Sequence, residues 1–184
     1  VNEVKFCEEF LREHPMKSVN GTFFTVEGRV TDEDALRREI YEMLKPHFST
    51  GLGKRVNNLL EALRLEAYAP DLPIQRDRIH VANGTLFLDG TFSSEREFCR
   101  NRLPVAYKPD APAPETWLRF LGELLYPEDI PTLQEFMGYC LLPTTKGQKM
   151  LMLIGRGGEG KSRIGVVLRS LLGSNMATGS IAKI

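Results

Sequence analysis

Residues 150–173 read MLMLIGRGGEGKSRIGVVLRSLLG. The first five, residues 150–154, form a short apolar run that is typical of a buried strand. After the loop, apolar residues recur every three or four positions and predict a helix with one buried face, which ends before Gly173. The residues of that face are Ile164, Val167, Leu168, Leu171 and Leu172. The segment is therefore predicted to be a strand, a glycine-rich loop and a helix.

The glycine-rich loop, residues 155–162, fits the phosphate-binding pattern G-x-x-x-x-G-K-[ST] at every fixed position. Its glycines allow backbone N–H groups to turn toward phosphate oxygens, and the helix N-terminus adds partial positive charge. Lys161 would reach the β- and γ-phosphates and the Ser162 hydroxyl would bind Mg²⁺, so these two are the expected catalytic residues. The expected nucleotide-binding residues are Gly155, Arg156, Gly157, Gly158, Glu159, Gly160, Lys161, Ser162 and Arg163. A glycine-rich turn with an unrelated lysine is the alternative.

The composition is that of an ordinary soluble globular protein: of 184 residues, 42% are hydrophobic and 26% are charged. The longest apolar run, residues 150–154, is too short to span a membrane. The N-terminus carries Glu3, Lys5, Glu8 and Glu9 and has no apolar signal segment. We therefore expect a cytoplasmic protein. Because the chain does not begin with Met, we also expect it to be a piece of a longer one.

The cysteines and histidines suggest no metal or catalytic site. The cysteines are too few and too widely spaced for a disulfide framework or a zinc site, so buried free thiols are expected. The histidines are isolated from one another and from the cysteines, and we assign them no catalytic role. These residues are Cys7, Cys99, Cys140, His14, His47 and His80.

The net charge of zero hides an asymmetry. Residues 146–184 contain seven basic residues and a single acidic one, Glu159, so residues 1–145 are acidic and show no global basic footprint for nucleic acid. Small basic groups in that part are either solvated surface or, if they share one face, contacts for a phosphate backbone. They are Arg37 and Arg38, Lys54 and Arg55, Arg76 and Arg78, and Arg100 and Arg102.

Residues 1–145 are predicted to be α+β, helix-rich with small hairpins. Two Asn-Gly pairs, at residues 20–21 and 83–84, predict hairpin turns, and a further strand is expected within residues 98–105. Helices are predicted at residues 3–14, from Thr31 as the cap to Pro46 as the stop, and at residues 54–68, 115–125 and 130–141. Their buried positions are expected to be Leu36, Ile40, Met43, Leu44, Val56, Leu59, Leu60, Leu63, Ala67, Trp117, Leu121, Leu125, Ile130, Leu133, Met137 and Cys140.

Five segments carry a family resemblance. Residues 79–86 read IHVANGTL, residues 107–111 YKPDA, residues 117–121 WLRFL and residues 133–139 LQEFMGY, and residues 148–149, QK, lead into the apolar run. In this order, followed by the phosphate-binding loop, the chain resembles the phage, plasmid and poxvirus primase–helicases, whose ATPases belong to helicase superfamily III. The resemblance covers roughly residues 30–173.

The resemblance implies two parts: a pre-ATPase helicase domain at residues 1–145 and an incomplete P-loop ATPase segment at residues 146–184. It further implies a homo-hexameric ring that uses ATP and Mg²⁺ to translocate on single-stranded or forked DNA, in a bacterial cytoplasm, encoded by a phage or mobile element. Many relatives carry Asn where this chain has Glu159. A carboxylate beside a triphosphate is unfavourable unless it points outward or pairs with Arg156 or Arg163.

The family's acidic pair on the next core strand, its polar sensor residue and its arginine finger have no counterpart in these residues, and phosphoryl transfer needs such groups. We therefore expect the chain alone to hydrolyse ATP poorly or not at all. We also expect residues 174–184 to be irregular or to pack on residues 1–145, because one strand and one helix cannot complete a parallel sheet.

Two other functions stay open. The chain could be a non-catalytic module that binds DNA or neighbouring subunits. It could also be a different P-loop ATPase, such as a small kinase, although those enzymes usually carry the loop near the N-terminus and not at residue 155.

Overall fold

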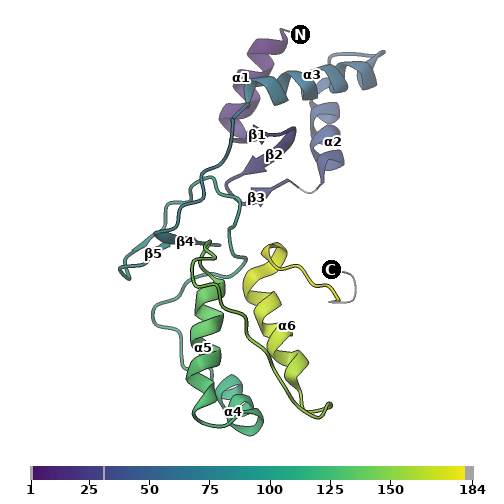
Figure 1. Ribbon diagram of the computed structural model, residues 1–184. Helices are drawn as coiled ribbons and strands as arrows, with labels where there is room; N and C mark the ends of the chain where they lie inside the picture. Colours follow the sequence, from purple (N-terminus) through teal and green to yellow (C-terminus); the bar gives the residue numbers. More distant parts are fainter. Residues whose placement is uncertain (1, 31, 181–184) are drawn as a thin grey trace. The chain divides into compact units, whose positions relative to one another are not determined.

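The computed structural model describes residues 2–30 and 32–180 (Figure 1). Within these residues the fold is α+β, with six α-helices and two three-stranded antiparallel sheets. The chain divides into two compact units, Val1–Pro73 with Phe98–Arg100, and Ile74–Glu97 with Asn101–Ile184. No helix among the described residues is both long and apolar enough to cross a membrane. The boundary predicted between residues 145 and 146 is not addressed by this division and stays a prediction.

The first unit contains three helices and one sheet. Its strands pair antiparallel in the order β1-β2-β3, with Ser18 opposite Phe23 and Phe24 opposite Arg29. Asn20 and Gly21 both have positive φ, at 50° and 74°, as a two-residue turn of type I′ requires. The elements are α1 (Glu3–Glu13), β1 (Lys17–Val19), β2 (Thr22–Thr25), β3 (Gly28–Arg29), α2 (Glu33–Leu44) and α3 (Leu52–Glu66).

Helix α3 lies at the centre of the first unit, and both α1 and α2 pack on it. The predicted face of α3 is confirmed, since all five of its expected residues are buried. Met43 of α2 is 41% exposed, which corrects the prediction that it is buried. The buried residues of α2 are four apart, at Leu36, Ile40 and Leu44, so they fill its inner face and Met43 points beside it. Thr31, the expected cap, lies outside the described residues; the side chain of Asp32 accepts the N–H of Ala35 at 3.0 Å.

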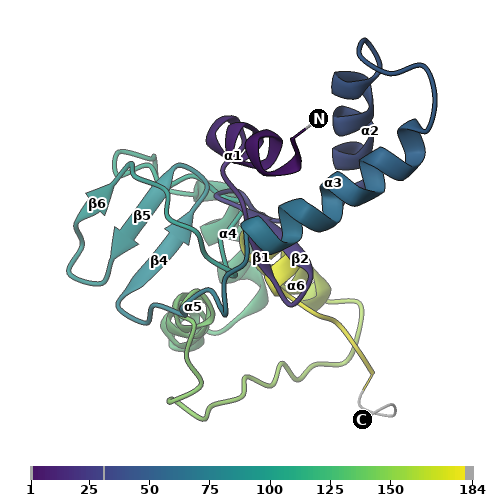
Figure 2. The same ribbon diagram turned by 90° about the horizontal axis from the view of Figure 1, so that it is seen from above.

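The second unit contains the other sheet and three helices. Its strands pair in the order β4-β5-β6, labelled in Figure 2. The hairpin predicted here forms, but its turn is at Ala82 and Asn83 and not at Asn83 and Gly84, because Val81 pairs with Gly84, the first residue of β5. The Asn83 amide exchanges two hydrogen bonds, of 2.9 and 2.8 Å, with the backbone of Tyr107. The elements are β4 (Arg78–Val81), β5 (Gly84–Phe87), β6 (Phe92–Ser93), α4 (Glu115–Leu124), α5 (Asp129–Cys140), α6 (Lys161–Leu172) and a 3₁₀ turn, η1 (Gly173–Asn175).

The strand expected within residues 98–105 does not form. The N–H of Leu103 bonds the carbonyl of His80 at 2.8 Å, and the N–H of Ala82 bonds the carbonyl of Val105 at 2.9 Å, so this segment does run beside β4. Pro104 between them has no N–H to donate, which prevents a continuous ladder. The third strand of the sheet is β6 instead.

Helix α6 joins the two hydrophobic clusters of the second unit. Ile164, near its start, packs with Leu121, Leu133 and Met137 of α4 and α5. Leu172, at its end, packs with a cluster around β4. The helix predicted after the glycine-rich loop is thus confirmed. Trp117, Leu125, Ile130 and Cys140 are half-buried at the edges of these clusters.

The buried strand expected at residues 150–154 is not formed. These residues have no regular secondary structure and no strand partner among the described residues, and Met150 and Ile154 are 82% and 86% exposed. A strand needs a neighbour for its backbone N–H and C=O groups, and without one only Leu151 packs against the α4–α5 cluster.

Residues after α6 pack on earlier parts of the chain, as expected. The amide of Asn175 donates to the carbonyl of Arg102 at 3.0 Å, and Met176 packs on the cluster around β4. Beyond η1, residues 176–180 are irregular. Residues 181–184, to which the same prediction applied, lie outside the described residues.

Candidate nucleotide-binding site

The glycine-rich loop leads directly into α6, whose first residue is Lys161. Three of its glycines, Gly157, Gly158 and Gly160, have φ values of 99°, 73° and 97°. L-residues with a Cβ rarely adopt this left-handed region, so the glycines allow the backbone to bend tightly here. Gly160 occupies the N-cap position of α6, and no side chain caps the helix there. The N–H of Arg163 bonds the Gly160 carbonyl at 2.9 Å, and no side chain accepts a capping hydrogen bond at the start of the helix.

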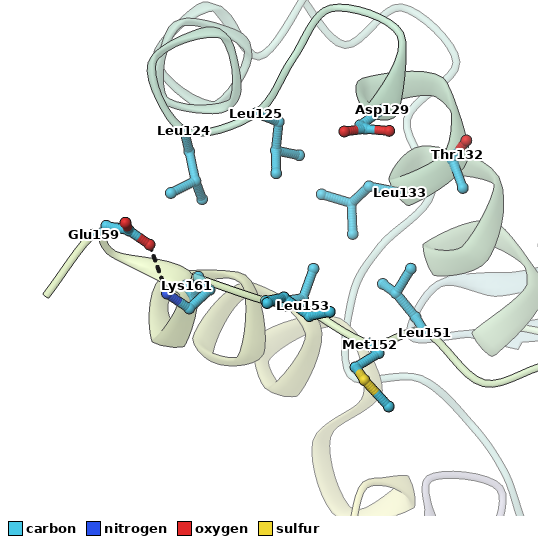
Figure 3. A pocket seen from close by; sticks show the side chains of 11 residues that line it. Leu124, Leu125, Asp129, Thr132, Leu133, Leu151, Met152, Leu153, Glu159 and Lys161 are labelled. Atoms are coloured by element: carbon cyan, nitrogen blue, oxygen red, sulfur yellow. Dashed lines mark hydrogen bonds and ion pairs between the residues drawn. The ribbon is translucent and has the colours of Figure 1, made fainter. Parts of the chain in front are cut away.

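An ion pair between Glu159 and Lys161 dominates the electrostatics of the loop. The Lys161 Nζ lies 2.7 Å from one carboxylate oxygen of Glu159, and the other oxygen accepts the backbone N–H of Arg156 at 3.2 Å (Figure 3). The hydrogen bond from Lys161, followed by that from Arg156, lowers the pKa of Glu159 below its ordinary value. Glu159 is therefore an ionised carboxylate that holds the lysine expected to bind phosphate.

The partner of Glu159 is one that the sequence did not suggest. The sequence left open that Glu159 points outward or pairs with Arg156 or Arg163, whereas the structure gives Lys161 and the backbone N–H of Arg156. A Cβ added at Gly155 would overlap both the Glu159 carboxylate and the Lys161 ammonium group. The glycine that begins the pattern therefore makes room for this ion pair.

A hollow of about 290 Å³ lies beside the ion pair. Figure 3 shows leucines of the α4–α5 corner and of residues 150–154 around it, with Glu159 and Lys161 at one side and Asp129 at the other. Ligand pockets in proteins run from about 300 to 1,000 Å³, so this hollow is at the small end of that range, closer in size to a phosphate group than to a whole nucleotide. Its lining is Leu124, Leu125, Asp129, Thr132, Leu133, Leu151, Met152, Leu153, Ile154, Glu159 and Lys161.

The structure brings together only some of the predicted site residues. Gly155, the Arg156 backbone, Glu159 and Lys161 are in contact with one another, whereas Ser162 and Arg163 are exposed. Residues 2–30 and 32–180 contain no cluster of three or more His, Cys, Asp or Glu that could hold a metal. The roles of Lys161 and Ser162 stay predictions. Sequence reasoning missed the α4–α5 leucines as part of this site, because their spacing indicated only a buried helix face.

The basic groups have mixed surroundings, and several are held by acidic partners. Arg102 is buried, and its guanidinium donates to the carbonyls of Val81, Gly84 and Glu97, so it is neither solvated surface nor a phosphate contact. This corrects both interpretations of Arg102. Three other arginines of these basic groups form ion pairs: Arg37 pairs with Glu33, Arg78 with Asp77 and Glu97, and Arg100 with Asp71.

The three cysteines are free thiols, as expected. Cys7 and Cys99 are buried and Cys140 is half-buried. Burial raises the pKa of both Cys7 and Cys140 above the ordinary thiol value, and for Cys7 the nearby carboxylates of Glu66 and Glu3 raise it further.

Comparison with known proteins assigns residues 7–125 to a protein family. A family model described as D5 N terminal like matches this range, which covers the whole first unit from Cys7 onward and the second unit as far as Leu125. The match does not reach the glycine-rich loop. None of the curated proteins searched matches the chain. Such domains are typical of D5-family primase–helicases. The chain therefore belongs to the D5 N terminal like family.

Proposed function

We propose that this chain is part of an ATP-dependent replicative DNA helicase of the primase–helicase type, and that residues 155–162 bind the triphosphate of ATP with Mg²⁺. One observation carries the proposal. A domain of the D5 N terminal like family is followed in the same chain by a phosphate-binding sequence that bends at three glycines into α6. Residues 146–184 would then be the first α/β segment of the ATPase.

The roles of the side chains follow from the loop's geometry. Lys161 at the start of α6 would bind the β- and γ-phosphates, backbone N–H groups would bind their oxygens, and the exposed Ser162 hydroxyl would bind Mg²⁺. Because the Glu159 carboxylate already holds Lys161, a phosphate must displace it. This exchange reduces the affinity of the loop for the triphosphate.

DNA and a ring of identical subunits are the proposed partners. The basic excess of residues 146–184 favours contact with an anionic polymer, since Lys and Arg side chains release counterions when they bind phosphates. The same excess would also suit a module that binds DNA without hydrolysing ATP, which is the second candidate.

Nucleotide binding is tested by titrating the chain with Mg·ATP and with a non-hydrolysable analogue in a calorimeter. Replacing Lys161 with Ala should weaken binding about ten- to a hundredfold, the range for a charge-assisted hydrogen bond. Lys149→Ala removes the same charge from an exposed site before the loop and should bind like the parent. Equal affinity in all three proteins would refute a nucleotide site at the loop.

DNA binding is tested by fluorescence anisotropy with single-stranded and forked oligonucleotides at several salt concentrations. Binding that weakens as salt rises would support the DNA partner. If DNA binds while ATP does not, the non-catalytic module is the better description. If neither binds, both proposed functions are refuted for this chain.

A further inference from the structure

A second, larger hollow lies next to the first one, in the same unit. It is an open groove of about 1,030 Å³, which we call the aromatic groove. Trp117 and Phe120 stack in its wall, with ring centroids 5.6 Å apart and planes inclined by 27°. Its lining is Pro112, Ala113, Pro114, Glu115, Thr116, Trp117, Phe120, Arg163, Val166 and Val167.

The groove and the phosphate-sized hollow meet at Gly160. Its neighbours in sequence, Glu159 and Lys161, line the smaller hollow. A Cβ added to Gly160 would lie 3.2 Å from the ring of Phe120, which lines the groove. Arg163, two residues after Lys161, also lines the groove. A ligand with phosphates at Lys161 therefore has the aromatic groove within immediate reach.

The chemistry of the groove suits a nucleobase. A base has two flat π-faces that stack on aromatic rings and on arginine guanidinium planes, and the groove offers Trp117, Phe120 and Arg163. The smaller hollow, at about 290 Å³, leaves little room for base and ribose in addition to phosphates. The positive charges of Lys161 and Arg163 also complement the anionic end of a nucleotide.

We propose that the aromatic groove binds the base and ribose of the nucleotide whose phosphates bind the glycine-rich loop. The proposal rests on the proposed nucleotide binding and adds the site of the nucleoside. Trp117 and Phe120 provide the surface on which the base stacks. Arg163 covers the base or contacts the phosphate attached to the ribose, and Gly160 keeps the passage between the two hollows open.

The test uses Trp117 as a reporter, because it is the only tryptophan of the chain. Mg·ATP should quench its fluorescence, whereas Mg·tripolyphosphate, which has phosphates and no base, should bind without quenching and should compete with ATP. Trp117→Leu, measured by calorimetry, should weaken ATP about tenfold, in the range for loss of one base–aromatic stack, and leave tripolyphosphate unchanged.

Two further variants sharpen the result. Phe120→Leu retains the reporter and should reduce both quenching and ATP affinity. Tyr126→Leu removes an exposed aromatic just after α4 that does not line the groove, and it should behave like the parent. Circular dichroism of each variant checks that the fold is retained.

The outcomes separate this inference from the proposed function. If ATP binds without quenching, and Trp117→Leu and Phe120→Leu bind it normally, the groove is not the nucleoside site, while the phosphate loop stands. If neither ATP nor tripolyphosphate binds, both proposals are overturned. If ATP does not quench the fluorescence, and quenching appears only when the chain self-associates, as measured by light scattering, then the groove binds protein and the inference is wrong.

Discussion

At the level of single residues, Glu159 forms an ion pair with Lys161, the residue that we propose binds phosphate. The carboxylate accepts one hydrogen bond from Lys161 and one from the Arg156 backbone, which is the kind of contact that a phosphate oxygen would accept. It thus acts as an internal counterion. Because its pKa is lowered, Glu159 stays ionised, and this competition persists at neutral and mildly acidic pH.

Replacing Glu159 with Gln should strengthen the binding of Mg·tripolyphosphate and Mg·ATP about two- to fivefold, the range for releasing an exposed ion pair. Lys161 is then free of its counterion, and the loop loses a negative charge. Calorimetric titration measures the effect. Glu123→Gln, an exposed carboxylate on α4, makes the same charge change outside both hollows and should have no effect. Weaker binding by Glu159→Gln would show that the carboxylate helps to shape the site.

His80 is a buried histidine on β4. Its Nε2 lies 2.8 Å from Oε1 of Gln75, and its Nδ1 lies 3.4 Å from Oγ1 of Thr85. Burial lowers its pKa below 6.5, assisted by the positive charges of Arg102 and Arg78, while Glu97 and Asp77 act in the opposite direction. The folded state therefore favours neutral His80, and the unfolded state takes up a proton first as pH falls.

The contribution of His80 to the free energy of unfolding should be complete above about pH 6.5 and decrease as pH falls below it, by at most about 1.4 kcal/mol per pH unit. Thermal unfolding between pH 7.5 and 5.5 measures this decrease. His80→Asn should flatten the pH dependence, whereas His47→Asn, at an exposed position, should leave it as it is. Parallel pH profiles for the parent and His80→Asn would contradict the assignment.

At the level of secondary structure, α3 is the element on which the first unit depends. Leu60 is fully buried in its core, whereas Leu65 on the same helix is 79% exposed. We expect Leu60→Ala to lower the free energy of unfolding by about 2–5 kcal/mol, because it loses transfer free energy and leaves a cavity. Leu65→Ala should change it by less than about 0.5 kcal/mol. Urea denaturation of the two variants measures the difference, and similar losses would contradict the packing of α3.

At the level of the whole molecule, each unit has hydrophobic clusters of its own. The clusters around α3 and β1–β2 belong to the first unit, and those around β4 and α4–α6 belong to the second. Separate cores allow separate opening, because local unfolding follows cooperative units.

Hydrogen exchange should show this separation. Leu60→Ala should speed exchange of amides in α1 and α3 and leave those of α5 unchanged, while Leu133→Ala, in the core of the second unit, should do the reverse. Mass spectrometry of peptides from each element gives the rates. If either variant speeds exchange equally in both units, the chain opens as a single cooperative body.

The sequence alone determined what local chemistry controls. Asn-Gly turns, three- and four-residue periodicity and the glycine-rich pattern each act within a few residues. Both hairpins form, and the buried face of α3 and the helix after the loop are confirmed. The family resemblance also rested on local segments, and the match at residues 7–125 supports it.

The tertiary structure alone decided what depends on distant partners. An apolar run such as residues 150–154 becomes a strand only if another strand accepts its hydrogen bonds, and Arg102 is buried only because carbonyls of the β4–β5 hairpin and of Glu97 surround it. The two hollows around the loop arise where α4 and α5 meet α6, more than 20 residues apart in sequence. Local patterns therefore predicted the helices and hairpins, while packing between elements determined whether the apolar runs form strands and which surfaces lie beside the glycine-rich loop.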